Sequence, residues 1–536
     1  MKITNLDNTL FFEKENIKTP KYNISTIREN TKKKPTWIHF GAGNIFRGFI
    51  AKIADNLLNE NIIETGIIAV DTHNTGTDDY EMLEKVYKDF NNLSLLVSIN
   101  PSGEIDKQII GSVAEVLHAD FINYYEKLKK IFISNSLQIA SFTITEKGYS
   151  IKDLNNNYKK IVTEDINNKP ENSKNIISIV TALLLERYKN GSYPITMLSM
   201  DNCANNGDKL KSSILDISIE WNKRGFVENN FIKYIEDNKK VSFPLTMIDK
   251  ITPRPSESIS KELTNLGFED MGIFKIGTTN MAGFVNSEAS EYLVIEDSFA
   301  NGRANLKGVY LTDRETVQKT EKMKVSACLN PLHTSLAIFG CLFNYNFIYE
   351  EMKDPILKKL VEKIGYDESL KVVSNPKIIN PIDFLKEVIE NRLTNPYIPD
   401  SPKRIAIDTS QKIPVRYGET IKAYIENELD ISKLIGIPIT IAAWLRYLMG
   451  IDDNGNNMSI SEDPMLEELK MHIKKIKFKN IESVKHNLRP ILSNKTIFLV
   501  DLYDKKINLG EKIEEYFKEM IIDKNAVRKC LEKYIK

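Results

Sequence analysis

Thr36-Trp-Ile-His-Phe-Gly-Ala-Gly-Asn-Ile-Phe-Arg-Gly48 is the stretch of sequence that decides the fold of this chain. Its first five residues predict a buried strand, and a helical pattern over residues 49–58 follows the glycines. A second apolar run, at residues 65–70, ends at Asp71. Strand, glycine turn, helix, strand and acid is the order of a dinucleotide-binding unit, so the stretch predicts a Rossmann-type domain.

The glycine turn is predicted to hold the pyrophosphate of a dinucleotide. Gly41 and Gly43 allow the backbone to approach phosphate closely, and the helix start after them presents N–H groups. Asn44, Arg47 and Gly48 complete the predicted cofactor-binding set, although the third glycine comes two residues later than in the common motif. A strand-to-helix turn without a ligand is the alternative interpretation.

Asp71 is predicted to select the cofactor. A carboxylate at the end of the second strand accepts hydrogen bonds from ribose hydroxyls and repels a 2′-phosphate, which favours NAD over NADP. The alternatives are a loop acid at Asp71 and a helix-surface position for Arg47 in place of a phosphate contact.

The rest of the N-terminal part indicates a mostly parallel sheet. Apolar runs at 138–144 and 194–199 read as strands on either side of a helical pattern at 176–188. Two short runs within 95–113 predict a hairpin, and the first 35 residues look like an extension.

The chain changes character near residue 310. Strand-like runs become rare, and helical patterns occupy residues 354–364, 381–392, 438–449, 465–477 and 513–535. Thr312-Asp-Arg-Glu315 reads as a capping box that starts a helix. We therefore expect an α/β protein with a Rossmann-type dinucleotide-binding domain at 1–310 and an all-helical substrate and catalytic domain at 311–536.

Composition excludes several classes of function. The 536 residues carry 73 basic and 73 acidic side chains, so net charge gives no reason to expect nucleic acid or an acidic membrane as a partner. The four cysteines are scattered, which indicates neither a disulfide framework nor a zinc site. We expect no metal, no window of the ~18 to 20 apolar residues of a membrane span, and a cytoplasmic protein of unknown oligomeric state.

Lys324-Val-Ser-Ala-Cys-Leu-Asn330-Pro-Leu-His333 is the second informative stretch. A partly buried amine can act as acid or base, an amide can hold a developing alkoxide, and an imidazole can hold a hydroxyl. Together these groups can oxidise an alcohol, or reduce a ketone, without a metal. A surface lysine, a helix cap and a core histidine are the alternative interpretation.

Several separated segments together resemble the polyol-specific long-chain dehydrogenases, the mannitol dehydrogenase family. The segments run in family order over residues 36 to about 345, and they are His39–Gly48, Thr145-Glu-Lys-Gly-Tyr149, Ser199-Met-Asp-Asn202 with Asn206-Gly207, Ile248–Pro253, Val294–Asp297 and Lys324–His333. Farther on, Arg404–Tyr417 looks like the family's C-terminal substrate segment, and the run Leu-Asn-Pro-x-His-Thr resembles its sugar-acid branch.

The resemblance implies a metal-independent hydride transfer with NAD. It makes Lys324 the general acid/base, Asn202 and Asn330 the pair that holds the carbonyl oxygen, and His333 a ligand of a substrate hydroxyl. Asp249 and Glu321 would line the site or relay protons. For the oxidation the amine must be neutral, so burial should lower its pKa from ~10.4.

Departures from the family pattern concern the lysine. Five residues separate Lys324 from Asn330, one more than in relatives, so Lys322 competes for the role. In one straight helix the two side chains would point about 120° apart. We therefore expect a kink or a π-turn between residues 324 and 331, with Pro331 at the first helical position and Asn330 as N-cap or bend residue. Lys324, Asn330 and Asn202 are expected to converge on a cleft between the domains.

The substrate is expected to be a small keto-uronate or keto-sugar. Arg416 and Arg254 are candidates for binding a carboxylate, with surface ion pairs as the alternative. The first expectation is the reversible reduction of D-fructuronate to D-mannonate; reduction of tagaturonate and oxidation of mannitol at carbon 2 are alternatives. From other classes, a non-catalytic dinucleotide sensor or a methyltransferase would need neither Lys324 nor His333.

Overall fold

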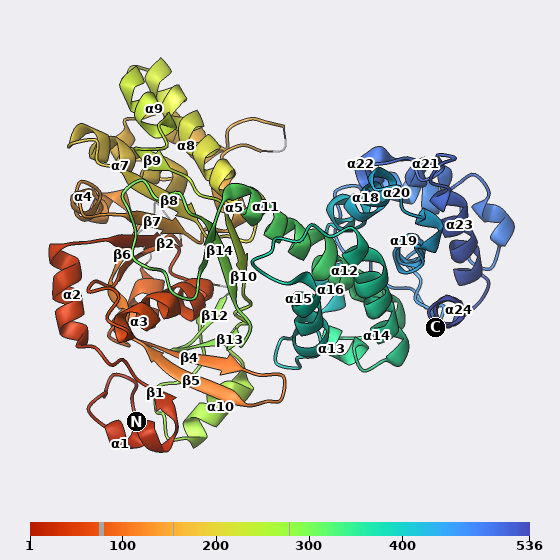
Figure 1. Ribbon diagram of the computed structural model, residues 1–536, viewed down its shortest axis with the longest axis horizontal. Coiled ribbons are helices and arrows are strands. Elements are labelled where there is room, and N and C mark those ends of the chain that lie inside the picture. The colour runs from red at the N-terminus through yellow and green to blue at the C-terminus, as the bar shows by residue number, and fades with distance from the viewer. Residues whose placement is uncertain (74–79, 154, 278) are drawn as a thin grey trace. The chain divides into compact units, whose positions relative to one another are not determined.

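The computed structural model describes residues 1–73, 80–153, 155–277 and 279–536 of the chain, which divides into two compact units (Figure 1). Unit 1 comprises Met1–Asn100 with Glu104–Gln318, and unit 2 comprises Pro101–Gly103 with Lys319–Lys536.

Unit 1 is built on a six-stranded sheet in the order β6-β3-β2-β7-β8-β9, and all five strand pairs are parallel. The strands of unit 1 are β1 Ile17–Lys18, β2 Trp37–Phe40, β3 Ile67–Asp71, β4 Ser94–Ile99, β5 Ile105–Ile110, β6 Val113–His118, β7 Ile139–Phe142, β8 Ile195–Ser199, β9 Val241–Ser242, β10 Thr246–Asp249, β11 Phe274–Ile276, β12 Thr279–Met281, β13 Phe284–Glu288, β14 Tyr292–Glu296 and β15 Tyr310–Thr312. The sheet confirms the predicted Rossmann-type architecture.

Helices cover both faces of this sheet (Figure 1). The helices of unit 1 are α1 Thr9–Lys14, α2 Ile24–Lys33, η1 Phe46–Ile50, α3 Ala51–Asn59, η2 Leu83–Lys88, α4 Phe121–Phe132, α5 Thr145–Tyr149, α6 Lys160–Asn167, η3 Pro170–Asn172, α7 Ile176–Lys189, α8 Asn206–Lys223, α9 Asn229–Glu236 and α10 Glu257–Asn265. Alternate strand residues enter opposite cores: Ile68 and Val70 pack with α4 and α7, whereas Ile67 and Ala69 pack with α3. Burial on both faces explains why the strands read as continuous apolar runs.

The first 35 residues are part of unit 1, so the expected extension was wrong. They form α1, β1 and α2, and β1 pairs in parallel with β5 at the edge of the sheet β1-β5-β4-β13. Ile3, Phe12 and Ile17 are buried in a third core beneath this sheet. The sequence did not predict this packing because the apolar residues of the segment are isolated among many polar ones. The predicted hairpin is confirmed as the antiparallel pair β4–β5.

Unit 2 is helical, and over Lys319–Lys536, all of it described, the extended pairing is confined to one isolated bridge, between Ile451 and Asn457. It continues α11 (Arg314–Met323) and contains η4 Lys324–Cys328, α12 Asn330–Phe343, α13 Ile348–Glu351, α14 Pro355–Glu362, η5 Lys363–Glu368, η6 Ser369–Lys371, α15 Pro381–Glu387, η7 Val388–Arg392, α16 Pro402–Ile405, α17 Thr409–Ile413, η8 Pro414–Gly418, α18 Glu419–Glu426, η9 Ile431–Lys433, α19 Gly436–Tyr447, α20 Leu466–Ile473, η10 Ile481–Val484, α21 Arg489–Leu492, α22 Lys495–Phe498, α23 Leu509–Met520 and α24 Ala526–Tyr534. The η elements of the chain are π-helices, except η3, η6, η9 and η10, which are 3₁₀-helices.

Most predicted C-terminal helices are confirmed, with two corrections. The pattern at 513–535 is two helices, α23 and α24, because Asn525 takes a left-handed conformation between them. The helix expected at Thr312 begins at Arg314, and Asp313 caps it by accepting a hydrogen bond from Thr316 N at 2.9 Å. A carboxylate one residue later thus replaces the expected threonine cap.

The helical run Arg314–Phe343 is long and apolar enough to cross a membrane, contrary to the expectation that no segment would be. Of its most apolar window, 83% is buried inside the protein, as in the core helix of a folded domain.

Candidate active site

The glycine turn follows β2 in a conformation that requires glycine at its first position. Gly41 has φ +110°, and a Cβ atom there would lie 2.2 Å from the carbonyl oxygen of Thr143. A Cβ at Gly43 would meet no atom within 4 Å. Gly48 lies inside η1 with its Cβ position 3.0 Å from Thr252 Cγ2. The first and third glycines therefore serve packing, and the second leaves open space in front of the helix.

A chain of buried hydrogen bonds supports the turn from below. Trp37 Nε1 donates to Ser141 Oγ at 2.7 Å, and the His39 ring joins Ser141 Oγ at 2.7 Å and Thr143 Oγ1 at 2.8 Å. Thr143 Oγ1 then donates to the carbonyl oxygen of Gly41 at 3.0 Å. These hydrogen bonds are mutually consistent if the imidazole is neutral, with Nδ1 accepting from Ser141 and Nε2 donating to Thr143. Burial lowers the pKa of His39 to about 3, which keeps the ring neutral.

The residues at this turn fit a dinucleotide. The helix begins at Asn44, whose Oδ1 is buried and has no hydrogen-bond partner among the described residues. The helix start supplies N–H groups beside the open space at Gly43. Asp71 lies at the end of β3, where its Oδ1 accepts from His73 N at 2.9 Å. Phosphate and ribose groups would find their partners on neighbouring strands β2 and β3.

Arg47 is buried and does not lie on the helix surface. Its Nε donates to Ser94 Oγ at 3.0 Å, and its Nη2 donates to the carbonyl oxygen of Ala282 at 2.9 Å. Burial lowers its pKa. The guanidinium thus ties η1 to the neighbouring sheet, and a contact of Arg47 with phosphate stays a prediction.

Three more predicted site residues lie in unit 1. Asn202 is exposed in the turn after β8. Asp249 is buried at the end of β10, opposite Tyr292 of β14, whereas the Arg254 side chain is exposed. The structure places Asp249 and Arg254 on one connection, five residues apart in the sequence, and their roles stay predictions.

Lys250 follows Asp249 directly, and its side chain is fully buried. Its buried amine bonds Glu291 Oε2 at 2.9 Å and the carbonyl oxygen of Glu288 at 2.6 Å. The compact ammonium therefore links the segment after β10 to Glu288 and Glu291, which is a structural role.

The predicted irregularity between residues 324 and 331 is confirmed. Lys324–Cys328 form the π-helix η4, and Leu329 N donates to the carbonyl oxygen of Lys324 at 3.1 Å, five residues back. The extra residue between lysine and asparagine is accommodated in this wider turn. The N-cap of α12 is Leu329, so Asn330 is the first helical residue and Pro331 the second; the expectation that Asn330 caps the helix was one residue off.

Burial separates the two competing lysines. Lys324 is 2% exposed. The Lys322 side chain is 52% exposed and pairs with Glu419 at 2.8 Å. Burial disfavours the charged form of an amine, so the buried Lys324 suits the acid/base role better than the exposed Lys322. Glu321 is partly buried on α11, one helical turn before Lys324.

Asn330, His333 and Arg416 come together in unit 2. Arg416 Nη1 donates to the carbonyl oxygen of Asn330 at 3.4 Å and to Thr334 Oγ1. His333 Nε2 lies 3.4 Å from Asp400 Oδ2. Burial lowers the pKa of His333 to about 4, although Asp400 acts in the opposite direction. Burial lowers the pKa of Arg416 to about 10.

Among the cationic groups around His333, Arg416 was predicted from the sequence, whereas Arg392 and Arg404 were missed. Arg392, Arg404 and Arg416 all disfavour protonation of the imidazole, and Asp400 pairs with Arg404. Lys412 lies near Arg416. Burial, and to a smaller extent the positive charge of Arg416, lower the pKa of Lys412 to about 8. The signal was present, because Arg404, Lys412 and Arg416 share the segment that resembles the family's substrate segment. Such a surplus of positive charge suits an anionic substrate.

The expected convergence of Asn202 of unit 1 with Lys324 and Asn330 of unit 2 stays a prediction. Within the described residues, no group of three or more His, Cys, Asp and Glu side chains is placed to hold a metal ion.

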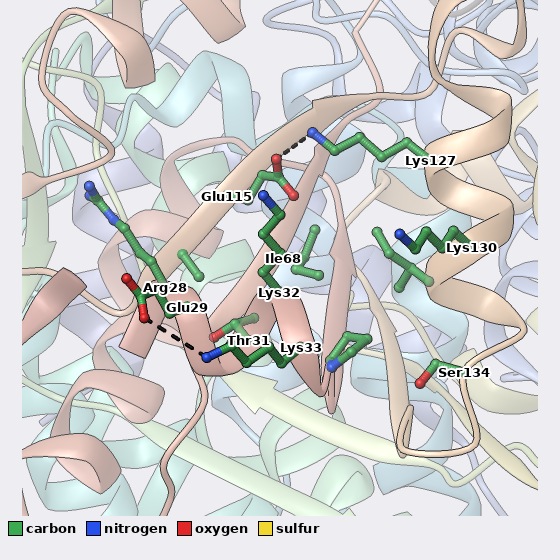
Figure 2. A pocket seen from close by; sticks show the side chains of 13 residues that line it. Arg28, Glu29, Thr31, Lys32, Lys33, Ile68, Glu115, Lys127, Lys130 and Ser134 are labelled. Atoms are coloured by element: carbon green, nitrogen blue, oxygen red, sulfur yellow. Dashed lines mark hydrogen bonds and ion pairs between the residues drawn. The ribbon is translucent and has the colours of Figure 1, made fainter. Parts of the chain in front are cut away.

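A cavity of about 490 Å³ in unit 1 is separate from the glycine turn. Figure 2 shows the side chains that line it, which include Lys32 of α2, Lys130 of α4 and Ile68 of β3. Glu29 and Glu115, its two acids, pair with lysines of the same lining. Its floor uses the amino-terminal halves of β3 and β6, whereas the glycine turn and Asp71 lie at the carboxyl ends of the strands.

Two family models match the chain. The model described as "Mannitol dehydrogenase Rossmann domain" matches residues 35–308, and "Mannitol dehydrogenase C-terminal domain" matches residues 316–521.

Known proteins match along nearly the whole chain. The protein named D-mannonate oxidoreductase of Thermotoga maritima is 53% identical over 531 residues, which are 98% of this chain and 97% of that protein. The polyol:NADP oxidoreductase of Gluconobacter oxydans is 28% identical over 83% of this chain and 86% of its own length. A solved D-sorbitol dehydrogenase in substrate-free form has a TM-score of 0.79 at 26% identity, covering 96% of this chain and 97% of that one.

Proposed function

This chain belongs to the mannitol dehydrogenase family, and from that premise we propose that it interconverts D-fructuronate and D-mannonate with NAD as cofactor. The observation that carries the proposal is the buried Lys324 on a π-turn, followed by Asn330 and His333. The high identity to a relative named D-mannonate oxidoreductase supports the choice of substrate.

The nicotinamide of bound NADH supplies the hydride in this reaction. In our proposal Lys324 delivers a proton to the ketone oxygen of fructuronate as the alcohol forms, and takes it back in the oxidation. The amides of Asn330 and Asn202 donate to that oxygen, at roughly 2.7 to 3.1 Å. Donors aimed at a growing negative charge favour the transition state over the ground state.

The remaining groups bind the substrate. A pKa of about 4 keeps His333 neutral at neutral pH, so its imidazole can exchange hydrogen bonds with a substrate hydroxyl. Arg416 is our first candidate for the carboxylate and Arg254 our second. Asp249 and Glu321 would line the site or relay protons.

Asp71 makes NAD the proposed cofactor. A relative that is named for NADP is 28% identical to this chain, so similarity to the family alone does not decide between the two cofactors. The carboxylate at the end of β3 would face the 2′-position of the adenosine ribose and repel a phosphate there. Gly43 and the helix start at Asn44 would hold the pyrophosphate, on a turn whose backbone conformation Gly41 permits. We also propose a cytoplasmic location, which the four free cysteines favour.

Two related activities are alternatives within the class. A tagaturonate reductase or a mannitol 2-dehydrogenase would use the same lysine and asparagines, and differ in the hydroxyl pattern of the substrate. A non-catalytic dinucleotide sensor would have no use for a buried amine at Lys324.

Loss of NADH absorbance with a panel of keto acids and keto sugars tests the proposal. We expect turnover with D-fructuronate to exceed that with D-tagaturonate and D-fructose, and NADH to be preferred over NADPH. Faster turnover of tagaturonate or fructose would overturn the substrate, and absence of turnover with every compound would overturn the proposed function.

A further inference from the structure

The loop after β7 is held in a strained conformation at the carboxyl edge of the sheet. Thr145 has φ +65°, a backbone conformation that β-branched residues rarely adopt. Its own side chain is exposed, so side-chain packing does not compensate the strain. A strained residue persists only where its surroundings impose the conformation, and such residues cluster at functional sites.

The carboxylate of Asp201, two residues after the end of β8, accepts hydrogen bonds from both backbone N–H groups at this position. Its Oδ1 accepts from Thr145 N at 3.1 Å, and its Oδ2 accepts from Ile144 N at 2.8 Å. The Tyr149 hydroxyl donates to Oδ2 at 2.6 Å and bonds Ser199 Oγ at 2.8 Å. One side chain thus holds both ends of the short helix α5.

Asp201 is itself held by hydrogen bonds in the bend after β8. Its carbonyl oxygen accepts from Asn206 Nδ2 at 3.0 Å and from Cys203 N at 2.9 Å. Asn206 also bonds the hydroxyl of Thr246 at 2.8 Å, and that hydroxyl donates to the carbonyl oxygen of Ser199 at 2.7 Å. Asp201 is therefore a rigid point to which the loop after β7 is attached.

The loop occupies the place where a dinucleotide site is expected in this topology. In the order β3-β2-β7 the chain turns back between β2 and β7, and ligands bind at the carboxyl ends of strands at such a switch point. Thr143, two residues before the strained position, packs directly against Gly41. Asn202, a proposed donor to the substrate oxygen, follows Asp201 in the sequence.

We propose that Asp201 is a positioning residue, whose carboxylate holds Thr145 in its left-handed conformation so that the loop after β7 presents a fixed surface to the nicotinamide half of the cofactor. The inference rests on the proposed function, because it needs a dinucleotide at this edge. It assigns the Thr145–Tyr149 segment to the alignment of hydride donor and acceptor.

Asp201→Asn removes the second carboxylate oxygen, so at least one of the three hydrogen bonds is lost. Misplacement of reacting groups by about 1 Å costs up to roughly 10²-fold in rate. We expect kcat to fall by 10- to 100-fold on that scale, with a smaller change in KM for the keto substrate. The hydride-transfer step should become more rate-limiting, which a larger isotope effect with 4-deuterated NADH would report.

Thr145→Gly is the decisive second change, because glycine adopts φ +65° without help from a carboxylate. In the Asp201→Asn background it should restore most of the lost kcat, although no hydrogen bond to residue 201 returns. Asp153→Asn is the matched control: Asp153 Oδ1 also accepts two loop N–H groups, from Asn155 and Asn157 at 2.9 Å, and its loss should leave kcat unchanged.

The outcomes separate this inference from the proposed function. A wild-type protein without NADH-dependent turnover overturns the function, whereas an active wild type with an unaffected Asp201→Asn variant overturns only the role of Asp201. A loss of kcat that tracks a loss of thermal stability and is not restored by Thr145→Gly would also overturn it. If Asp201→Asn does not fold, Tyr149→Phe carries the test: a partial loss of kcat, restored by Thr145→Gly, is expected, and an unrestored loss contradicts the proposal.

Discussion

The glycine turn of unit 1 and residues Lys324–His333 of unit 2, here called the lysine segment, both contain a π-helix, but the groups around them differ. At the turn, the His39 ring and the Nε and Nη2 atoms of Arg47 are buried against hydroxyls and a carbonyl oxygen, with which they form hydrogen bonds. Around His333 in unit 2, the charges of three arginines act against that of one carboxylate, Asp400.

This difference divides the expected effects of substitution. Changes at the turn alter backbone shape and packing, so they should act on stability and cofactor affinity. Changes in the lysine segment alter proton and charge positions, so they should act on the rate of turnover. In each region, two variants at neighbouring positions with different surroundings test whether the effect falls on stability, cofactor affinity or turnover.

Lys324→Ala should have the largest effect. Proton transfer by a placed side chain contributes about 10² to 10⁴-fold, so kcat should fall by that factor while NADH affinity is kept. Steady-state kinetics and NADH fluorescence titration measure the two quantities. Lys322→Ala is the control, since the Lys322 side chain is exposed and pairs with Glu419; an inactive Lys322 variant beside an active Lys324 variant would reverse the assignment.

Gly41→Ala and Gly43→Ala should separate packing from cofactor binding within the turn. At Gly41 a methyl group overlaps the Thr143 carbonyl and the positive φ adds roughly 1–3 kcal/mol of strain, so urea unfolding should show a clear loss of stability. At Gly43 the methyl group enters open space, so stability should be unchanged while KM for NADH rises. An equal loss of stability in both variants would show that Gly43 also serves packing.

The glycine turn could be predicted from the sequence because its backbone conformation depends on residues that are close together in the chain. Gly41, the strand before it and Asp71 after the next strand follow from spacing and residue type alone. The π-turn at Lys324 was also predictable, since one extra residue before Asn330 has to be accommodated.

Contacts between distant segments could not be read in this way. Ser94 and Ala282, the partners of Arg47, lie 47 and 235 residues away, so the sequence offered only a phosphate contact or a helix-surface position for Arg47. The burial of the first residues on β5 depends likewise on a strand more than 80 residues later. The Asp201 clamp on Thr145 joins two loops that only the strand order brings together.

Lowering the pH should destabilise both regions through histidines that stay neutral. The pKa of His39 is about 3 and that of His333 about 4, both below the ordinary 6.5. Below pH 6.5 the unfolded chain binds protons that these folded imidazoles refuse, so stability present above pH 6.5 is lost as the pH falls. At about pH 5 each histidine should cost about 2 kcal/mol. Urea unfolding at pH 7 and about pH 5 should show a shallower pH dependence in His39→Asn and in His333→Asn than in the wild type; an unchanged dependence would mean that the ring is protonated in the fold.

Asp71→Ser should have the smallest effect and should leave the lysine segment untouched. The carboxylate at the end of β3 favours NADH by accepting ribose hydroxyls and by repelling a 2′-phosphate. Serine keeps a hydrogen-bonding group but removes the charge, so the ratio of kcat/KM for NADH over NADPH should narrow by about tenfold, the equivalent of about 1.4 kcal/mol. Because Lys324 still moves the proton, kcat at saturating NADH should stay near the wild-type value. The test is to measure kcat/KM for NADH and for NADPH on the wild type and on the variant. A wild type that prefers NADPH would remove Asp71 from this role. A variant with a lower kcat and an unchanged NADH-to-NADPH ratio would show that Asp71 affects turnover rather than cofactor choice.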